Sequence, residues 1–179
     1  VLESVTTGKA DIGFLAYEAA RAKLVDYSDP YLLSGSAYAV RADSGIRRTA
    51  EVDRAGVTVG AVTGQSQAVW VGEQIKSARI HAIPAVPPNA ALAAMLLDGT
   101  VDAFAANRTR MEELAQDFPS IRVLDDDFLV VGQAIVVAQG NRARLDELNP
   151  FLADVRASGF VQASIDRANI PGVKVATGP

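Results

Sequence analysis

The 179-residue sequence contains no cysteine and a single histidine, His81. Without cysteine there can be no disulfide, no thiolate nucleophile and no thiolate metal ligand. One histidine leaves mainly carboxylates for a metal site, which argues against zinc. His81 lies in the alternating segment Arg79–Ile83, interpreted as a half-exposed strand with a surface histidine rather than as part of a Ser-His pair. Asp125–Asp127 lacks the alternation and the glycine of a calcium loop and is interpreted as a solvated turn. We therefore expect no metal and no cofactor, and we assign no catalytic residue.

A basic stripe and a long apolar run are also missing. The formal net charge is −4, and the 17 lysines and arginines are scattered along the chain, so nucleic acid is not an expected partner. No apolar stretch approaches the roughly 18 residues that span a bilayer, and no signal-peptide pattern opens the sequence. What the chain does have is 49% hydrophobic residues, enough to bury the core of one large domain or two small lobes.

Strand and helix patterns alternate from Ile46 onward, which predicts βα units and a mainly parallel sheet. The predicted segments are the strands Val57–Val62, Arg79–Ile83, Val101–Ala106 and Ile121–Leu124 and the helices Ala68–Ile75, Ala90–Asp98 and Met111–Asp117. Asn89 is the expected cap of the helix that follows it, and Met95 is interpreted as core.

Two extended segments, Leu32–Arg41 and Phe128–Ala138, flank this region. A helical pattern over Arg142–Ser158 follows, in which Pro150 predicts a kink or a fresh start, and Phe160–Ala168 predicts a further short helix.

The stretch Lys9–Tyr31 carries the most specific pattern. Asp11–Leu15 is a short apolar run that predicts a strand buried on both faces. A helical turn at Glu18–Lys23 would return the guanidinium of Arg21 over the carboxyl end of this strand, where open α/β sheets bind ligands. A surface ion pair between Arg21 and Glu18 is the competing interpretation.

This stretch resembles the type 2 periplasmic solute-binding proteins, specifically the family that serves amino-acid importers, bacterial extracellular solute-binding protein family 3. The matching residues are Gly8, Ala10, Asp11, Ile12, Arg21, Val25, Asp26, Tyr27, Ser28, Pro30 and Tyr31. The resemblance implies an α/β fold of two lobes, with mainly parallel sheets flanked by helices, that close on a small solute. It also implies that Arg21 binds the ligand's carboxylate, with contacts from Leu15 and Ala16. Ala16 replaces the family's threonine, and the loop before Arg21 is short for the family.

The resemblance places further ligand contacts on the glycine-containing turn Thr63-Gly64-Gln65-Ser66. Free backbone N–H groups in such a turn suit an anion, whereas the competing interpretation is an ordinary turn with Ser66 as N-cap. Gln133, midway along its extended segment, is a further candidate.

Asn107 stands where the family has the aspartate that binds an amino group. Its carbonyl oxygen can accept a hydrogen bond but cannot neutralise a buried ammonium. We therefore expect a preference for solutes without one. Arg108 either adds positive charge beside Asn107 or is a solvated arginine at a helix start.

The chain is expected to begin inside a helix, Val1–Thr7, which ends at Gly8. By the resemblance, a first lobe covers residues 1–40 and 131–179 and a second lobe residues 41–130, and about 40–50 residues of the first lobe are missing from the sequence. The implied partners are a small solute and a membrane importer, and the implied location is periplasmic. Self-association of the truncated chain is expected. A sensor domain of a bacterial signalling protein and a dehydratase-like enzyme on the same fold stay open.

Overall fold

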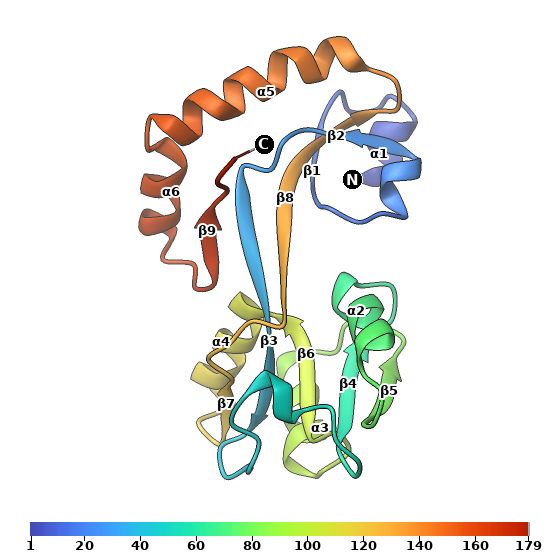
Figure 1. Ribbon diagram of the computed structural model, residues 1–179, viewed down its shortest axis with the longest axis vertical. Helices are drawn as coiled ribbons and strands as arrows, with labels where there is room; N and C mark the ends of the chain where they lie inside the picture. Colours follow the sequence, from blue (N-terminus) through green and yellow to red (C-terminus); the bar gives the residue numbers. More distant parts are fainter. Residues whose placement is uncertain (179) are drawn as a thin grey trace. The chain divides into compact units, whose positions relative to one another are not determined.

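The computed structural model describes residues 1–178, which divide into two compact units (Figure 1). The first unit combines Val1–Ser34 with residues 131–178, and the second is the continuous stretch Gly35–Val130. Two ten-residue strands, β3 (Leu32–Arg41) and β8 (Leu129–Ala138), each have residues in both units. The second unit is thus inserted into the first at two strand crossings.

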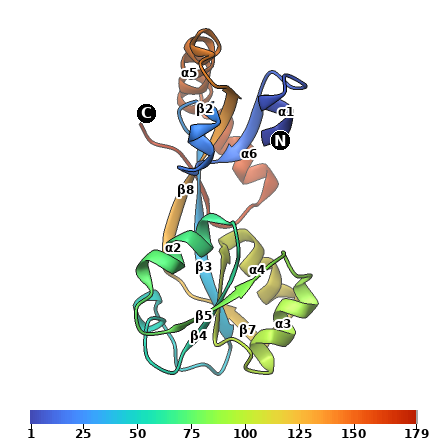
Figure 2. The same ribbon diagram turned by 90° about the vertical axis from the view of Figure 1, so that its right-hand side faces the viewer.

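The second unit is a sheet covered by helices on both faces (Figure 2). Within it, β4 lies parallel to both β5 and β6, and β3 pairs antiparallel with β6 and β7. Figure 2 shows α2 on one side of this sheet and α3 and α4 on the other. The elements are β4 (Thr58–Val62), β5 (Arg79–Ile83), β6 (Ala103–Asn107), β7 (Ile121–Val123), α2 (Ser66–Gln74), α3 (Asn89–Leu97), α4 (Arg108–Asp117) and the 3-10 turn η2 (Thr49–Glu51).

The period-2 alternation of the strands divides the core of this unit into two layers. On β6, Phe104 packs against Leu96 and Met111 from α3 and α4, whereas the next residue, Ala105, packs in the layer that holds Val71 of α2. All five side chains are essentially buried. The predicted α/β architecture, parallel strands flanked by helices, is therefore confirmed, and so is the core position of Met95, which packs against the first layer.

The first unit is built around β8 and the start of β3. Both β1 and β2 pair antiparallel with β8, and β9 pairs antiparallel with β3. The elements are α1 (Leu2–Thr6), β1 (Gly13–Ala16), η1 (Arg21–Lys23), β2 (Val25–Tyr27), α5 (Arg142–Ala157), α6 (Phe160–Ala168) and β9 (Val173–Val175). As predicted, α1 ends just before Gly8, whose φ of 72° is the left-handed conformation that glycine adopts without strain.

The prediction that β1 is buried on both faces is wrong. The strand begins at Gly13 rather than Asp11, and the Phe14 side chain is 57% exposed. The reason is that β1 stands at one end of the strand order and pairs only with β8 among the described residues. An apolar run therefore does not by itself predict a central strand.

The predicted cap of α3 is wrong, and so is the cap in the competing interpretation of the turn before α2. Asn89 is the first residue of α3 and Pro88 occupies the cap position, while α2 is capped at Gln65 rather than Ser66. Pro150 does not start a new helix, since α5 continues through it. No helix within residues 1–178 has the length and apolar character needed to cross a membrane.

Candidate functional site

In the first unit, Arg21 returns to the carboxyl end of β1, as its place in the motif predicted. Its Nη1 donates to the carbonyl oxygen of Ala16, the last residue of β1, over 3.4 Å. Its Nε lies 2.9 Å from Oε2 of Glu18, and the two side chains are 32% and 21% exposed. The pair is therefore partly accessible, and the guanidinium keeps donors on its Nη edge.

Two tyrosines border this ion pair. The hydroxyl of Tyr27 donates to the Ala16 carbonyl oxygen over 3.1 Å, so Tyr27 and Arg21 share one acceptor. The ring of Tyr17 meets that of Tyr27 edge-on at 5.2 Å. Burial raises the pKa of Tyr27 against the opposing effect of the neighbouring Arg21 charge, so the tyrosine stays a neutral hydrogen-bonding group at physiological pH.

The register of β1 on β8 brings further candidates to the same place. Ala16 lies opposite Gln133 and Leu15 opposite Ala134. The backbone of Gln133 is fixed by Tyr31, whose N–H donates to the Gln133 carbonyl oxygen over 3.0 Å. In this unit the structure therefore brings Ala16, Arg21 and Gln133 together at one end of β1, with Leu15 next to them in the strand.

In the second unit, the turn from Thr63 to Ser66 leads from β4 into α2. Gly64 has a φ of 79°, which glycine adopts without strain, and the N–H of Thr63 donates to Ile83 over 2.9 Å. Gln65 is the N-cap residue of α2. Its backbone carbonyl oxygen accepts hydrogen bonds from the first turn of the helix, but its side chain makes no capping hydrogen bond. The exposed turn thus presents a helix start without a side-chain cap.

Asn107 ends β6 and caps α4. Its Oδ1 accepts from the N–H of Thr109 over 3.0 Å, so this carbonyl serves the helix start. Across the sheet Asn107 lies opposite Ser36, whose hydroxyl accepts from Nε2 of buried Gln67 over 3.0 Å. The start of α2, β3 and the end of β6 therefore meet in one polar region.

Arg108 is held firmly rather than solvated, which corrects one of its two interpretations. Its Nε lies 2.7 Å from Asp127 and its Nη1 3.1 Å from Glu112, while Nη2 donates to the carbonyl oxygens of Leu124 and Asp125 at 3.0 Å each. The side chain is only 11% exposed. With two carboxylates and two carbonyls as partners, Arg108 has few donors left for a ligand.

The aspartates that follow have structural partners as well. The Asp126 carboxylate accepts from the N–H of Thr49 at 3.1 Å, and the Asp127 carboxylate lies where a Cβ on Gly35 would be. A side chain at Gly35 would displace this carboxylate from its ion pair with Arg108. Within residues 1–178 no group of three or more acidic or histidine side chains is placed to hold a metal ion.

Sequence reasoning missed several polar groups that adjoin the predicted residues. Tyr17 and Tyr27 gave no functional signal beyond their place in the motif, and the bond between Ser36 and Gln67 joins residues 31 positions apart. Glu18 was identified only as the partner of Arg21. The spacing of three residues predicted that ion pair correctly.

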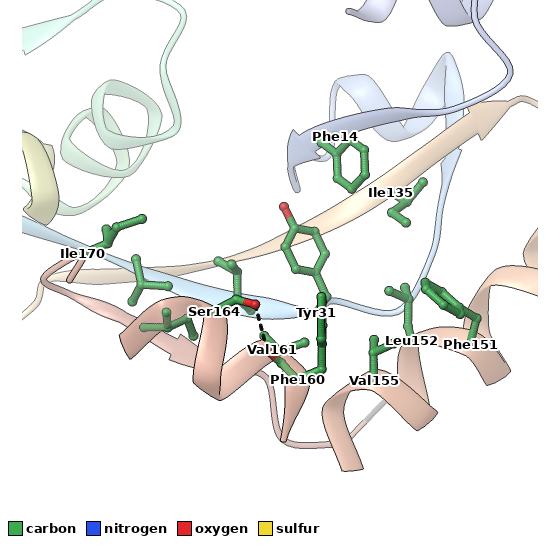
Figure 3. A pocket seen from close by; sticks show the side chains of 13 residues that line it. Phe14, Tyr31, Ile135, Phe151, Leu152, Val155, Phe160, Val161, Ser164 and Ile170 are labelled. Atoms are coloured by element: carbon green, nitrogen blue, oxygen red, sulfur yellow. Dashed lines mark hydrogen bonds between the residues drawn. The ribbon is translucent and has the colours of Figure 1, made fainter. Parts of the chain in front are cut away.

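The first unit also contains an apolar groove of about 380 Å³ (Figure 3). One wall contains Phe14 of β1, Ile135 of β8 and Tyr31, which precedes β3, and the rings of Phe14 and Tyr31 meet edge-on at 5.9 Å. The opposite wall comes from α5 and α6, where Phe151 and Phe160 are 57% and 61% exposed. The lining is almost entirely carbon, so this groove does not suit a charged solute.

Comparison with known proteins gives one family. The model of the bacterial extracellular solute-binding proteins, family 3, matches residues 1–168. No curated protein matches the sequence.

Solved structures share the fold at low identity. One is the amino acid ABC transporter substrate-binding protein AbpA from Streptococcus pneumoniae bound to L-arginine (21% identity, 94% of this chain and 71% of that chain, TM-score 0.72). Another is a histidine kinase sensor domain similar to periplasmic binding proteins (20%, 98% and 75%, TM-score 0.75). A third is an ancestral amino acid-binding protein, a precursor of cyclohexadienyl dehydratase (22%, 93% and 72%, TM-score 0.70). Identities this low show the fold alone.

Proposed function

Because the chain belongs to the bacterial extracellular solute-binding proteins of family 3, we propose that it binds a small solute bearing a carboxylate, an amino acid or a related organic acid, and delivers it to an importer in the membrane. The family description supports a location outside the cytoplasm, and we propose the periplasm. A structural neighbour bound to L-arginine supports the amino-acid class.

The position of Arg21 is the observation that carries this proposal. Its guanidinium lies at the carboxyl end of β1, partly accessible, with Nη donors beyond those used by Ala16 and Glu18. A planar guanidinium edge matches a carboxylate in a bidentate arrangement. We further propose Thr63–Ser66 and Asn107, on the second unit, as ligand contacts that offer backbone and polar side-chain groups.

A sensor domain of a signalling protein is the second candidate function. The histidine kinase sensor domain matches 98% of this chain, which favours that alternative. Both functions need the same solute binding. They differ in the partner that responds to the bound protein, a membrane importer in one case and a signalling domain in the other. We further propose a binding protein rather than an enzyme, although one neighbour is a precursor of a dehydratase.

Copies of the chain are also proposed to associate through the apolar groove of the first unit. The groove is lined by carbon, and its rim carries the exposed rings of Phe151 and Phe160. The same surface thus offers both a groove and the apolar groups to fill it on a second copy. Such self-complementarity is what a two-fold interface requires.

The Arg21→Ala variant tests the proposed binding. Native mass spectrometry of the purified wild type identifies a co-purifying solute, and thermal shift with amino acids and related carboxylates finds others. Truncating one partner of a hydrogen-bonded charge pair costs about 2–5 kcal/mol. Calorimetry should therefore show binding weaker by roughly tenfold or more in Arg21→Ala.

Arg144→Ala is the matched control, because Arg144 forms an ion pair with Glu147 at the same i,i+3 spacing and the same 2.9 Å in the first unit. This variant should bind like the wild type. Equal affinity of Arg21→Ala and wild type would refute the assignment of Arg21. Absence of any carboxylate ligand would refute the proposed function itself.

A further inference from the structure

We infer that Glu18 is a ligand-binding residue that receives the ammonium of a zwitterionic solute whose carboxylate is bound by Arg21. The inference rests on the proposed function and specifies the class of solute at the same site. It reverses the expectation from Asn107 alone, which favoured solutes without an ammonium.

The first argument is the charge next to Arg21. Glu18 lies 2.9 Å from the Arg21 Nε, and both side chains are partly accessible. A solute with only a carboxylate would meet the negative charge of Glu18 at the same distance range at which it meets the guanidinium. A zwitterion avoids this repulsion. Its ammonium and its carboxylate are joined through one carbon, so the ammonium can face Glu18 while the carboxylate faces Arg21.

The second argument is the hydrogen-bonding capacity of the pair. The ion pair uses Nε of Arg21 and Oε2 of Glu18. The Nη donors of Arg21 can bind a carboxylate, and Oε1 of Glu18 can accept from an ammonium. Both charged groups of an α-amino acid thus find an opposite partner within one unit.

The third argument is the aromatic surroundings. Tyr17 is 52% exposed and follows Ala16 directly, and its ring meets that of Tyr27 at 5.2 Å. Aromatic faces attract cations such as an ammonium, which adds to the attraction of Glu18. The Ala16 carbonyl oxygen, shared by Arg21 and Tyr27, fixes the group at the end of β1.

The second unit offers no equal alternative. Asn107 is uncharged, and its Oδ1 caps α4 through Thr109. The carboxylates of Glu112 and Asp127 both bind Arg108, the residue after Asn107, and that arginine is only 11% exposed. Because most donors of Arg108 are used within the protein, that arginine has few left to bind a solute carboxylate beside these two acidic residues, whereas Arg21 keeps Nη donors next to Glu18.

The Glu18→Gln variant tests this inference with pairs of probes. Each L-amino acid is compared by calorimetry with the carboxylate that lacks its α-amino group, for example L-leucine with 4-methylpentanoate. In Glu18→Gln the amino acid should bind about tenfold more weakly or worse, because an ionic hydrogen bond is lost. The amine-free carboxylate should bind equally well or better, since the repulsion is gone. Glu18→Asp, which keeps the charge, should retain part of the preference for the amine.

The control is Glu147→Gln, which removes the carboxylate of the exposed i,i+3 pair with Arg144 and should change neither affinity. Equal loss of both probes in Glu18→Gln would overturn the inference and assign Glu18 a purely structural role. If the wild type binds only amine-free carboxylates, the proposed function stands and this inference fails. If no probe binds, both fail.

Discussion

Replacing Tyr38 by phenylalanine is expected to stabilise the second unit. Tyr38 is fully buried between the sheet and α2, and its hydroxyl is the buried side-chain polar atom that has no hydrogen-bond partner among the described residues. Burial raises the pKa of this tyrosine, so the hydroxyl stays neutral. Leaving a buried polar group unpaired costs about 1–3 kcal/mol.

The magnitude follows from what phenylalanine keeps and removes. The ring and its packing on Phe128, at 4.3 Å between centroids, are retained, while the unpaired oxygen is lost. The vacated space is close to one water-sized sphere of roughly 10–15 Å³. At ~24 cal/mol per Å³ this cavity costs about 0.3 kcal/mol. A net gain of about 1 kcal/mol is expected, or roughly 2–4 °C in melting temperature for a chain of this size.

The chain carries its own probe for this measurement. Its single tryptophan, Trp70, packs on Phe128 at 4.9 Å, and Phe128 packs on Tyr38. Tryptophan fluorescence during urea denaturation therefore reports the unit that contains the substitution. The Tyr38→Ala variant, which also removes the ring, should lose about 3–5 kcal/mol. A Tyr38→Phe variant less stable than wild type would refute the reasoning and indicate that a bound water satisfies the hydroxyl.

Two further predictions concern each unit separately. The Asp53 carboxylate accepts from the N–H groups of Ala78, Ser77 and Lys76 at 2.9, 2.6 and 3.0 Å, which lower its pKa in the folded state. A carboxylate whose pKa is lower in the folded state stabilises the fold when the pH is above its unfolded-state pKa, near 4. This contribution is lost as the pH falls through the folded-state pKa. The stability gap between wild type and Asp53→Asn, read from tryptophan fluorescence in urea, should therefore be constant near neutral pH and shrink below about pH 4; a gap independent of pH would contradict this. For self-association, light scattering should report a species larger than 18.8 kDa that Phe160→Ser returns to the monomer, with Val86→Ser, at an exposed apolar residue outside the groove, as the control; a monomeric wild type would exclude the interface.

Local sequence patterns predicted several elements to the residue. The strand Arg79–Ile83 and the helix Phe160–Ala168 have the predicted bounds. In both segments the side-chain pattern indicates the type of element, and turn residues mark its ends. Helix starts were less predictable. The helix expected to begin at Met111 begins at Arg108, because Asn107 is its cap. The spacing of apolar residues, from which the helix was predicted, does not identify a cap residue.

The arrangement around Arg21 was predictable because it is local. Arg21 lies three positions after Glu18 and five positions after Ala16, so a single turn determines both contacts. The environment of Arg108 was not predictable, because three of its four partners lie 16 to 19 positions away on another loop. Tertiary contacts of this kind decide whether an arginine is available to a ligand, and the pattern of a sequence does not contain them.

The insertion of the second unit into the first has a consequence for the order in which the chain folds during synthesis. The second unit is one continuous stretch, Gly35–Val130, and can fold as soon as it leaves the ribosome. Residues 1–34 emerge earlier, yet β1 and β2 pair with β8, which emerges later. At translation rates of about 5–20 residues per second, the apolar side chains of β1 wait roughly 5 to 20 seconds for their partner strand. During that interval the nascent chain exposes a segment suited to chaperone binding, and a premature stop before β8 would release a folded second unit with an unpaired amino-terminal arm.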